Sequence, residues 1–125
     1  MSAPLPSPLS SLAPVDLDPE GTFKYVLIEA YQTVDGTEHC KLLVRGWARA
    51  EYHADIYDEV EEGIRKQGLD AQCLGGGRIQ HNPQNKYVKV YGYSMGFGRA
   101  DHTKAVTLIK EKYPGYTVEW SNEGY

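Results

Sequence analysis

The chain has 125 residues, and its 13 lysines and arginines against 17 aspartates and glutamates give it a net charge of −4. This length suits one domain rather than two, and its 41% of hydrophobic residues includes no run approaching the ~20 residues of a membrane helix. An acidic chain is a poor ligand for nucleic acid or anionic lipid, so a site for an anion must rest on a local cluster of positive groups.

The two cysteines, Cys40 and Cys73, form neither a disulfide framework nor the CxxC pair of a zinc ribbon. The first residues have neither the basic region nor the continuous apolar core of a secretory signal. We therefore expect an intracellular protein with reduced thiols, located in the cytoplasm.

The first 19 residues contain five of the seven prolines and four serines. Each proline removes a backbone donor, and few large apolar groups accompany these prolines. The composition therefore predicts a disordered or loosely packed tail over residues 1–19 and a folded domain over residues 20–125.

Residues 22–31 (TFKYVLIEAY) are rich in β-branched and aromatic side chains and predict a strand. Alternation leaves both faces of this strand largely apolar, which is typical of a central strand covered on both sides. The turn signal Asp35-Gly36 separates it from a second predicted strand over residues 40–45, and the two are expected to form a hairpin.

Residues 50–67 predict an amphipathic helix, because Ile56, Val60 and Ile64 recur at a spacing of four residues. Gly68 suits the end of this helix. His53 stands three residues before Ile56, so it is expected on the inward-facing side at the start of the helix.

The second half of the chain contains two glycine-rich stretches, at residues 75–77 (GGG) and 92–98 (GYSMGFG). The first predicts a flexible or tightly turned loop, and the second predicts another glycine-rich loop. Asp101 suits the N-cap of a second helix. Strands are expected over residues 78–81, 86–93 and 117–120, and the second helix over residues 101–112.

This order of elements predicts an α/β fold of the α+β kind. We expect a single domain in which a mixed β-sheet of about five to six strands packs with two main helices.

The stretch from Cys73 to Arg78 (CLGGGR) invites comparison with cysteine phosphatases, in which a thiolate and an arginine close one phosphate loop. The loop of those enzymes is longer by one residue, so its amides would aim differently here. The simpler alternative is a small buried residue before a glycine turn.

The glycine-rich stretch at residues 92–98 precedes a predicted helix, and backbone N–H groups at such a junction can cradle a phosphate. Ser94 adds a hydroxyl group. The stretch is neither a P-loop nor a dinucleotide fingerprint. An ordinary turn is the alternative interpretation.

The four histidines, at positions 39, 53, 81 and 102, lack the helical spacing of a metal-binding pair, so we expect no dedicated metal site and no cofactor. An inward-facing histidine near neutrality suits general-base catalysis. A core or capping role is the alternative for His53.

Seven motifs stand in a characteristic order: FKYVLI (23–28), VRG (44–46), AEYHADIYD (50–58), CLGGGRI (73–79), VYGYSM (90–95), KYPGY (112–116) and WSNEGY (120–125). Together they closely resemble the small protein phosphohistidine phosphatases of the janus family. The resemblance extends from about residue 15 to the last residue.

This resemblance implies a metal-independent hydrolase that removes phosphate from phosphohistidine in proteins or peptides. The family's catalytic histidine matches His53, and His102, which also has a counterpart in relatives, is a possible secondary site residue. Members often have alanine where this chain has Gly96, but glycine retains the backbone N–H. The residues that match the family's phosphate-binding positions are Lys24, Arg45, Arg78, Tyr93, Ser94, Met95 and Gly96.

Two roles are open for His53 under this interpretation: it can deprotonate an attacking water, or it can attack phosphorus itself. An alternative function is a non-catalytic phosphopeptide-binding module that uses the same Lys24 and loop without turnover. We expect a monomer with no nucleic-acid or membrane partner.

Overall fold

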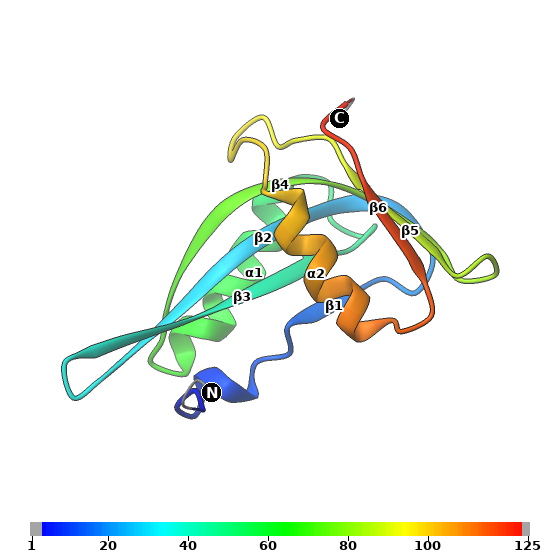
Figure 1. Ribbon diagram of the computed structural model, residues 1–125. Helices are drawn as coiled ribbons and strands as arrows, with labels where there is room; N and C mark the ends of the chain where they lie inside the picture. Colours follow the sequence, from blue (N-terminus) through cyan, green and yellow to red (C-terminus); the bar gives the residue numbers. More distant parts are fainter. Residues whose placement is uncertain (1–3, 124–125) are drawn as a thin grey trace.

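The computed structural model describes residues 4–123, which form one six-stranded mixed sheet with two α-helices. Figure 1 shows α1 and α2 on opposite faces of this sheet. The elements in chain order are the 3-10 helix η1 (Leu9–Ser11), β1 (Val15–Leu17), β2 (Gly21–Val34), β3 (Thr37–Gly46), α1 (His53–Lys66), β4 (Asp70–Asn82), β5 (Tyr87–Tyr91), α2 (His102–Lys112) and β6 (Thr117–Trp120). This architecture confirms the predicted fold class.

The strands lie side by side in the order β1-β3-β2-β4-β5-β6. The outer pairs β1/β3 and β5/β6 are parallel, and the three inner pairs are antiparallel. The predicted hairpin of β2 with β3 is present, and its turn holds Asp35 and Gly36 at positive φ. None of the helices in residues 4–123 is long and apolar enough to cross a membrane.

Strand β2 is the central strand that its sequence predicts, because its alternating side chains enter two separate cores. Tyr25 and Leu27 pack in the core beneath α2, whereas Val26 and Ile28 pack in the core beneath α1. All four side chains are fully buried. Since Lys24 alternates with Tyr25, it lies on the α1 face of the sheet.

The glycines at residues 75–77 do not form the loop that the sequence predicts. They lie inside β4 and pair with β2, where Tyr25 stands opposite Gly77 and Val26 opposite Gly76. The glycines are needed because other groups pack directly against this backbone: a Cβ on Gly76 would lie 2.7 Å from the ring of His53, and one on Gly75 would lie 2.7 Å from the backbone nitrogen of Ala100. Close packing, rather than flexibility, explains this run of glycines.

The N-terminal segment also differs from the sequence expectation. The sequence predicts a disordered or loosely packed tail over residues 1–19, whereas in the structure Leu9 is fully buried and β1 pairs with β3. The side-chain oxygen of Gln32 accepts the N–H of Leu9 at 3.1 Å. A few apolar side chains and acceptors at the right places dock a segment whose average composition favours disorder. Residues 1–3 lie outside the described part of the chain.

Glycine substitutions test whether residues 75–77 are constrained by packing. A Cβ on Gly77 would lie 2.4 Å from the carbonyl oxygen of Tyr91 and 2.8 Å from the ring of His102. We expect Gly77→Ala to lower the free energy of unfolding by at least ~1–3 kcal/mol, as overpacking does. Urea denaturation measures this change.

Gly63 provides the matched control, because it lies inside α1 and a Cβ there would meet no atom within 4 Å. Gly63→Ala should raise the free energy of unfolding by about 1 kcal/mol through helix propensity. Equal effects of the two substitutions would contradict the packing explanation for β4.

Candidate active site

A cleft of about 500 Å³ opens between the start of α1, strands β2 and β4, and the loop that joins β5 to α2. Most of the candidate residues from the sequence meet there. The lining residues are Lys24, Glu51, Tyr52, His53, Ala54, Arg78, Tyr93, Ser94, Met95, Gly96 and Phe97. Arg45 and His102 are not among them.

His53 is the first residue of α1, and its ring packs against the strand at Gly76. It is buried, as the spacing of the helix predicts. Its Nε2 atom lies 2.8 Å from the carbonyl oxygen of Gly77. A carbonyl oxygen accepts and never donates, so Nε2 carries the proton. In the neutral ring, Nδ1 is then the nitrogen with the free lone pair.

The surroundings of His53 keep its imidazole neutral. Burial lowers its pKa most, the carbonyl of Gly77 opposes this change, and the positive charges of Lys24 and Arg78 lower the pKa further. A neutral imidazole at physiological pH is the form that can accept a proton or attack an electrophile.

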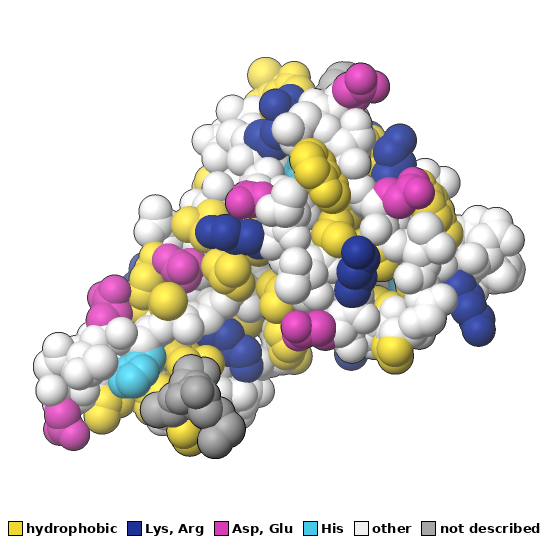
Figure 2. Space-filling view, in the orientation of Figure 1, with side chains coloured by type: hydrophobic (Ala, Val, Ile, Leu, Met, Phe, Trp, Pro, Cys, Tyr) yellow, Lys and Arg dark blue, Asp and Glu magenta, His cyan; other side chains and the backbone are white. Residues whose placement is uncertain are grey.

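Lys24 and Arg78 are directly paired residues of β2 and β4, and both line the cleft. Directly opposed side chains on neighbouring strands lie roughly 5 Å apart at Cβ. An anion in this cleft would therefore lie near both positive charges. This pair is the local positive cluster that the acidic composition requires. Figure 2 shows acidic and basic side chains interspersed over the opposite, α2 face.

The loop at residues 92–98 is closed by its own hydrogen bonds. Ser94 and Gly98 exchange two backbone bonds, of 3.0 and 2.8 Å, and the buried hydroxyl of Ser94 accepts the N–H of Phe97 at 3.1 Å. The hydrogen bonds of residues 4–123 do not use the N–H groups of Met95 and Gly96. Two donors at the tip of a tight loop that lines the cleft suit the oxygens of a phosphate.

His102 lies on the other face of the sheet, buried in the core beneath α2. Its Nε2 atom lies 2.8 Å from the carbonyl oxygen of Gly92, so Nε2 donates, and the hydroxyl of Tyr25 donates to its Nδ1 at 2.5 Å. His102 therefore supports the residue where the loop at 92–98 begins and does not reach the cleft.

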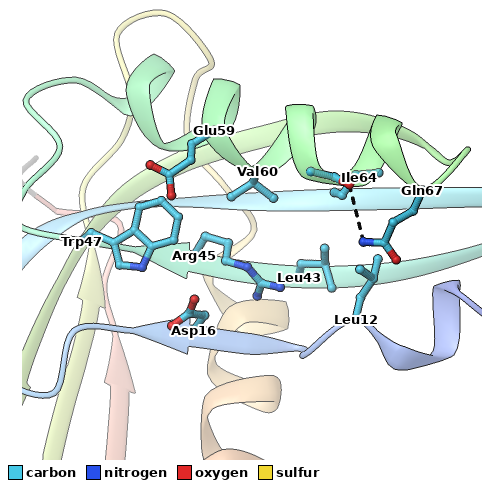
Figure 3. Close-up of a pocket in the computed structure, with 10 residues that line it drawn as sticks. Leu12, Asp16, Leu43, Arg45, Trp47, Glu59, Val60, Ile64 and Gln67 are labelled. Carbon is cyan, nitrogen blue, oxygen red and sulfur yellow. Dashed lines mark hydrogen bonds between the residues drawn. The ribbon is translucent and has the colours of Figure 1, made fainter.

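Arg45 lies in a second, smaller cleft of about 240 Å³. Figure 3 shows its side chain between α1 and β1, on the side of Asp16, whose charge acts on it. Its guanidinium is buried and donates to the carbonyl oxygens of Ala13 at 2.7 Å and Val44 at 3.0 Å. These bonds link the N-terminal segment to β3, so Arg45 has a structural role outside the larger cleft.

Cys73 lies in β4 rather than in a phosphate loop. Burial raises the pKa of its thiol to about 11, which disfavours the thiolate that a nucleophilic cysteine needs. Cys73 and Arg78 are separated along an extended strand, so they do not close one loop around an anion. The structure therefore favours the simpler interpretation of Cys73.

Within residues 4–123, no group of three or more histidine, cysteine, aspartate or glutamate side chains is arranged to hold a metal ion. The chemistry that the described cleft offers is a neutral imidazole, two cations and backbone N–H groups.

Two features of the site are not predicted from the sequence. The carbonyl of Gly77 assigns the proton of His53, and the side chain of Tyr52 stands 62% exposed at the mouth of the cleft. The first was hidden by the interpretation of residues 75–77 as a loop. The second carries a signal, because an aromatic residue is uncommon just before a helix, where serine, threonine, aspartate or asparagine is preferred.

Comparisons with known proteins identify relatives across almost the whole chain. The family model described as Janus/Ocnus family matches residues 9–117. The sex-regulated protein janus-A of Drosophila pseudoobscura pseudoobscura is 52% identical over 119 residues, which cover 94% of this chain and 80% of that protein. The 14 kDa phosphohistidine phosphatase of Sus scrofa is 50% identical over 120 residues, which cover 94% of this chain and 95% of that protein.

The pH dependence of stability tests the buried, neutral histidines. Burial lowers the pKa of both His53 and His102, so between about pH 6.5 and those lowered values the unfolded chain binds more protons than the folded chain. We expect the free energy of unfolding to decrease as the pH falls through this window. Urea denaturation at several pH values measures it, and NMR titration of the ring signals locates each pKa.

His53→Asn isolates the contribution of His53, because asparagine does not titrate. This variant should show a shallower loss of stability than the wild type over the same pH window. An identical pH dependence, or a ring pKa of His53 above 6.5, would contradict the assignment of a neutral imidazole.

Proposed function

The chain belongs to the Janus/Ocnus family, and on this premise we propose that it is a metal-independent protein histidine phosphatase, which hydrolyses the P–N bond of phosphohistidine. The observation that carries the proposal is the neutral His53, which has its lone pair on Nδ1 and lines a cleft with two cations. The N–H groups of Met95 and Gly96 in the same cleft are not used by the hydrogen bonds of residues 4–123. A curated relative with the name of a phosphohistidine phosphatase supports it.

In this proposal Lys24, Arg78 and the loop from Tyr93 to Gly96 bind the phosphoryl group. The two cations balance the charge of its oxygens, and the N–H groups of Met95 and Gly96 donate to them. The start of α1 also faces the cleft, and the positive end of a helix dipole favours an anion there. Because the cations belong to the floor of the cleft, an acidic protein can still bind an anionic substrate.

His53 provides the reactive nitrogen. As a base, Nδ1 takes a proton from water while the water oxygen bonds to phosphorus and the P–N bond breaks; the proton then passes to the leaving imidazole. As a nucleophile, Nδ1 bonds to phosphorus while the P–N bond to the substrate breaks, and the leaving imidazole takes a proton from water. A second water then bonds to phosphorus, the bond between phosphorus and Nδ1 breaks, and phosphate leaves with His53 neutral again. Both routes need the lone pair on Nδ1, which the bond from Nε2 to Gly77 supports.

The remaining parts of the proposal follow from this chemistry. The enzyme needs no metal or cofactor, because imidazole leaves readily once protonated, and its substrates are phosphohistidine-containing proteins or peptides. We further propose that it acts as a monomer in the cytoplasm. All residues that line the cleft belong to the predicted domain of residues 20–125.

Replacement of the reactive histidine tests this function. We expect His53→Ala to lower the rate of phosphate release from a phosphohistidine peptide by at least ~100-fold, the usual contribution of an acid–base residue. The wild type should release phosphate in the presence of a chelator. His39→Ala, on β3 outside the cleft, and Cys73→Ser should both retain activity.

Other outcomes of this experiment select other functions. Full activity of His53→Ala would refute the mechanism, and loss of activity in Cys73→Ser would favour a cysteine phosphatase. Retention of the phosphopeptide by the wild type without release of phosphate would instead identify a binding module.

The hydroxyl of Ser94 tests the phosphate-binding loop. Without it, the N–H of Phe97 loses its acceptor, and the loop keeps only the two backbone bonds between Ser94 and Gly98. We expect Ser94→Ala to weaken the binding of inorganic phosphate by roughly tenfold, equivalent to ~1.4 kcal/mol. NMR titration with phosphate measures the dissociation constant.

Ser121 is the matched control, because its hydroxyl accepts the N–H of Glu123 at 3.0 Å in an exposed turn outside the cleft. Ser121→Ala should bind phosphate like the wild type. Unchanged affinity in Ser94→Ala would remove this loop from the proposed phosphate site.

A further inference from the structure

Exposed apolar side chains gather at the mouth of the cleft. In the described part of the chain, five large apolar side chains are exposed, and three of them line this cleft: Tyr52 at 62%, Met95 at 93% and Tyr93 at 37%. Large apolar groups that cluster in water next to a pocket are typical of a surface that binds something. A site that binds only phosphate does not need apolar side chains around it, since phosphate has no apolar surface.

The position of Tyr52 is not explained by the fold. It is the N-cap residue of α1, with extended backbone, and its N–H donates to the carboxylate of Asp55 at 2.9 Å. A serine at this position would complete the reciprocal capping arrangement with Asp55, whereas tyrosine is a poor N-cap. Tyr52 thus stabilises the helix less than serine would, and its ring is exposed at a cleft; this combination points to a role in binding.

The cleft also has room for more than a phosphorylated side chain. Its volume of about 500 Å³ lies in the range of sites for drug-sized ligands. The polar groups, His53, Lys24 and Arg78, account for the phosphoryl end. The side chains of Tyr52 and Met95 also line the cleft and form an exposed apolar wall beside these polar groups.

We propose that Tyr52 is a specificity-determining residue, which together with Met95 receives a bulky apolar side chain next to the phosphohistidine of the substrate. This inference rests on the proposed function. Successive Cα atoms are only 3.8 Å apart, so the neighbours of a phosphohistidine held at Lys24 and the loop lie within reach of this wall, which lines the same cleft.

The chemistry of the wall defines the class of neighbour that it accepts. Methionine is unbranched and adapts to different apolar partners, and an aromatic ring offers a broad apolar face. The ring of Tyr93 lies 5.9 Å from the guanidinium of Arg99, which contributes to holding it in place. The wall therefore selects bulky apolar side chains as a class rather than one residue type.

Two phosphohistidine peptides test the inference. They are identical except that the residues immediately before and after the phosphohistidine are leucine in one and serine in the other. We expect the wild type to hydrolyse the leucine peptide with a kcat/KM about tenfold higher, because partial burial of an apolar side chain contributes a discrimination of this order. The difference should lie mainly in KM, as expected for contacts made equally in the ground and transition states.

The variant Tyr52→Ser should reduce this ratio to about twofold, and its thermal stability should equal or exceed that of the wild type because serine is the better N-cap. Tyr52→Phe should retain the preference, because it keeps the ring. Trp120→Ser is the matched control: Trp120 is exposed and aromatic, but lies outside the cleft, so its loss should leave the ratio unchanged.

The possible failures are distinguishable. Equal kcat/KM for the two peptides in the wild type would overturn the apolar subsite. An undiminished preference in stable Tyr52→Ser would overturn the assignment to Tyr52. Release of phosphate from neither peptide by the wild type would overturn the proposed function and, with it, this inference.

Discussion

The close contact between His53 and the backbone of β4 is the constraint on which the site depends. The imidazole packs where Gly76 has no side chain, and its Nε2 donates to the carbonyl of Gly77. On the other face of the same strand, Gly77 leaves space for the buried ring of His102, which holds the start of the loop at 92–98. The glycines of β4 thus allow His53 to pack on one face of the strand and His102, which bonds to the start of the loop, to pack on the other.

The electrostatics of the cleft follow from the same arrangement. Lys24 and Arg78 stand opposite each other on β2 and β4, and both line the cleft. Their charges also help to lower the pKa of His53, although burial contributes most. The residues that favour a phosphate therefore keep the imidazole in the form that can react with it. The chain can bind an anion despite its net negative charge, because nearby charges in the cleft act more strongly than distant, screened charges on the surface.

Local patterns predict the elements of this fold well, because each pattern has a direct physical cause. The two helices, the hairpin and the central strand appear where periodicity, capping residues and turn signals place them. The patterns fail at residues 75–77 and in the N-terminal segment. In both cases composition suggests flexibility, whereas contacts with residues distant in the sequence, such as His53 for Gly76 and Gln32 for Leu9, decide the conformation.

Motifs and periodicity are local properties, so they suffice to predict the family, the mixed sheet with two helices, and the inward position of His53. Which candidates share a cleft depends instead on how the chain folds in three dimensions. The tertiary structure joined Lys24, Arg78 and the loop at 92–98 to His53, and it placed Arg45 beneath α1 and His102 on the opposite face. The physical reason is that the pairing of strands and the alternation of their side chains assign each residue to a face, and neither is encoded within a single motif.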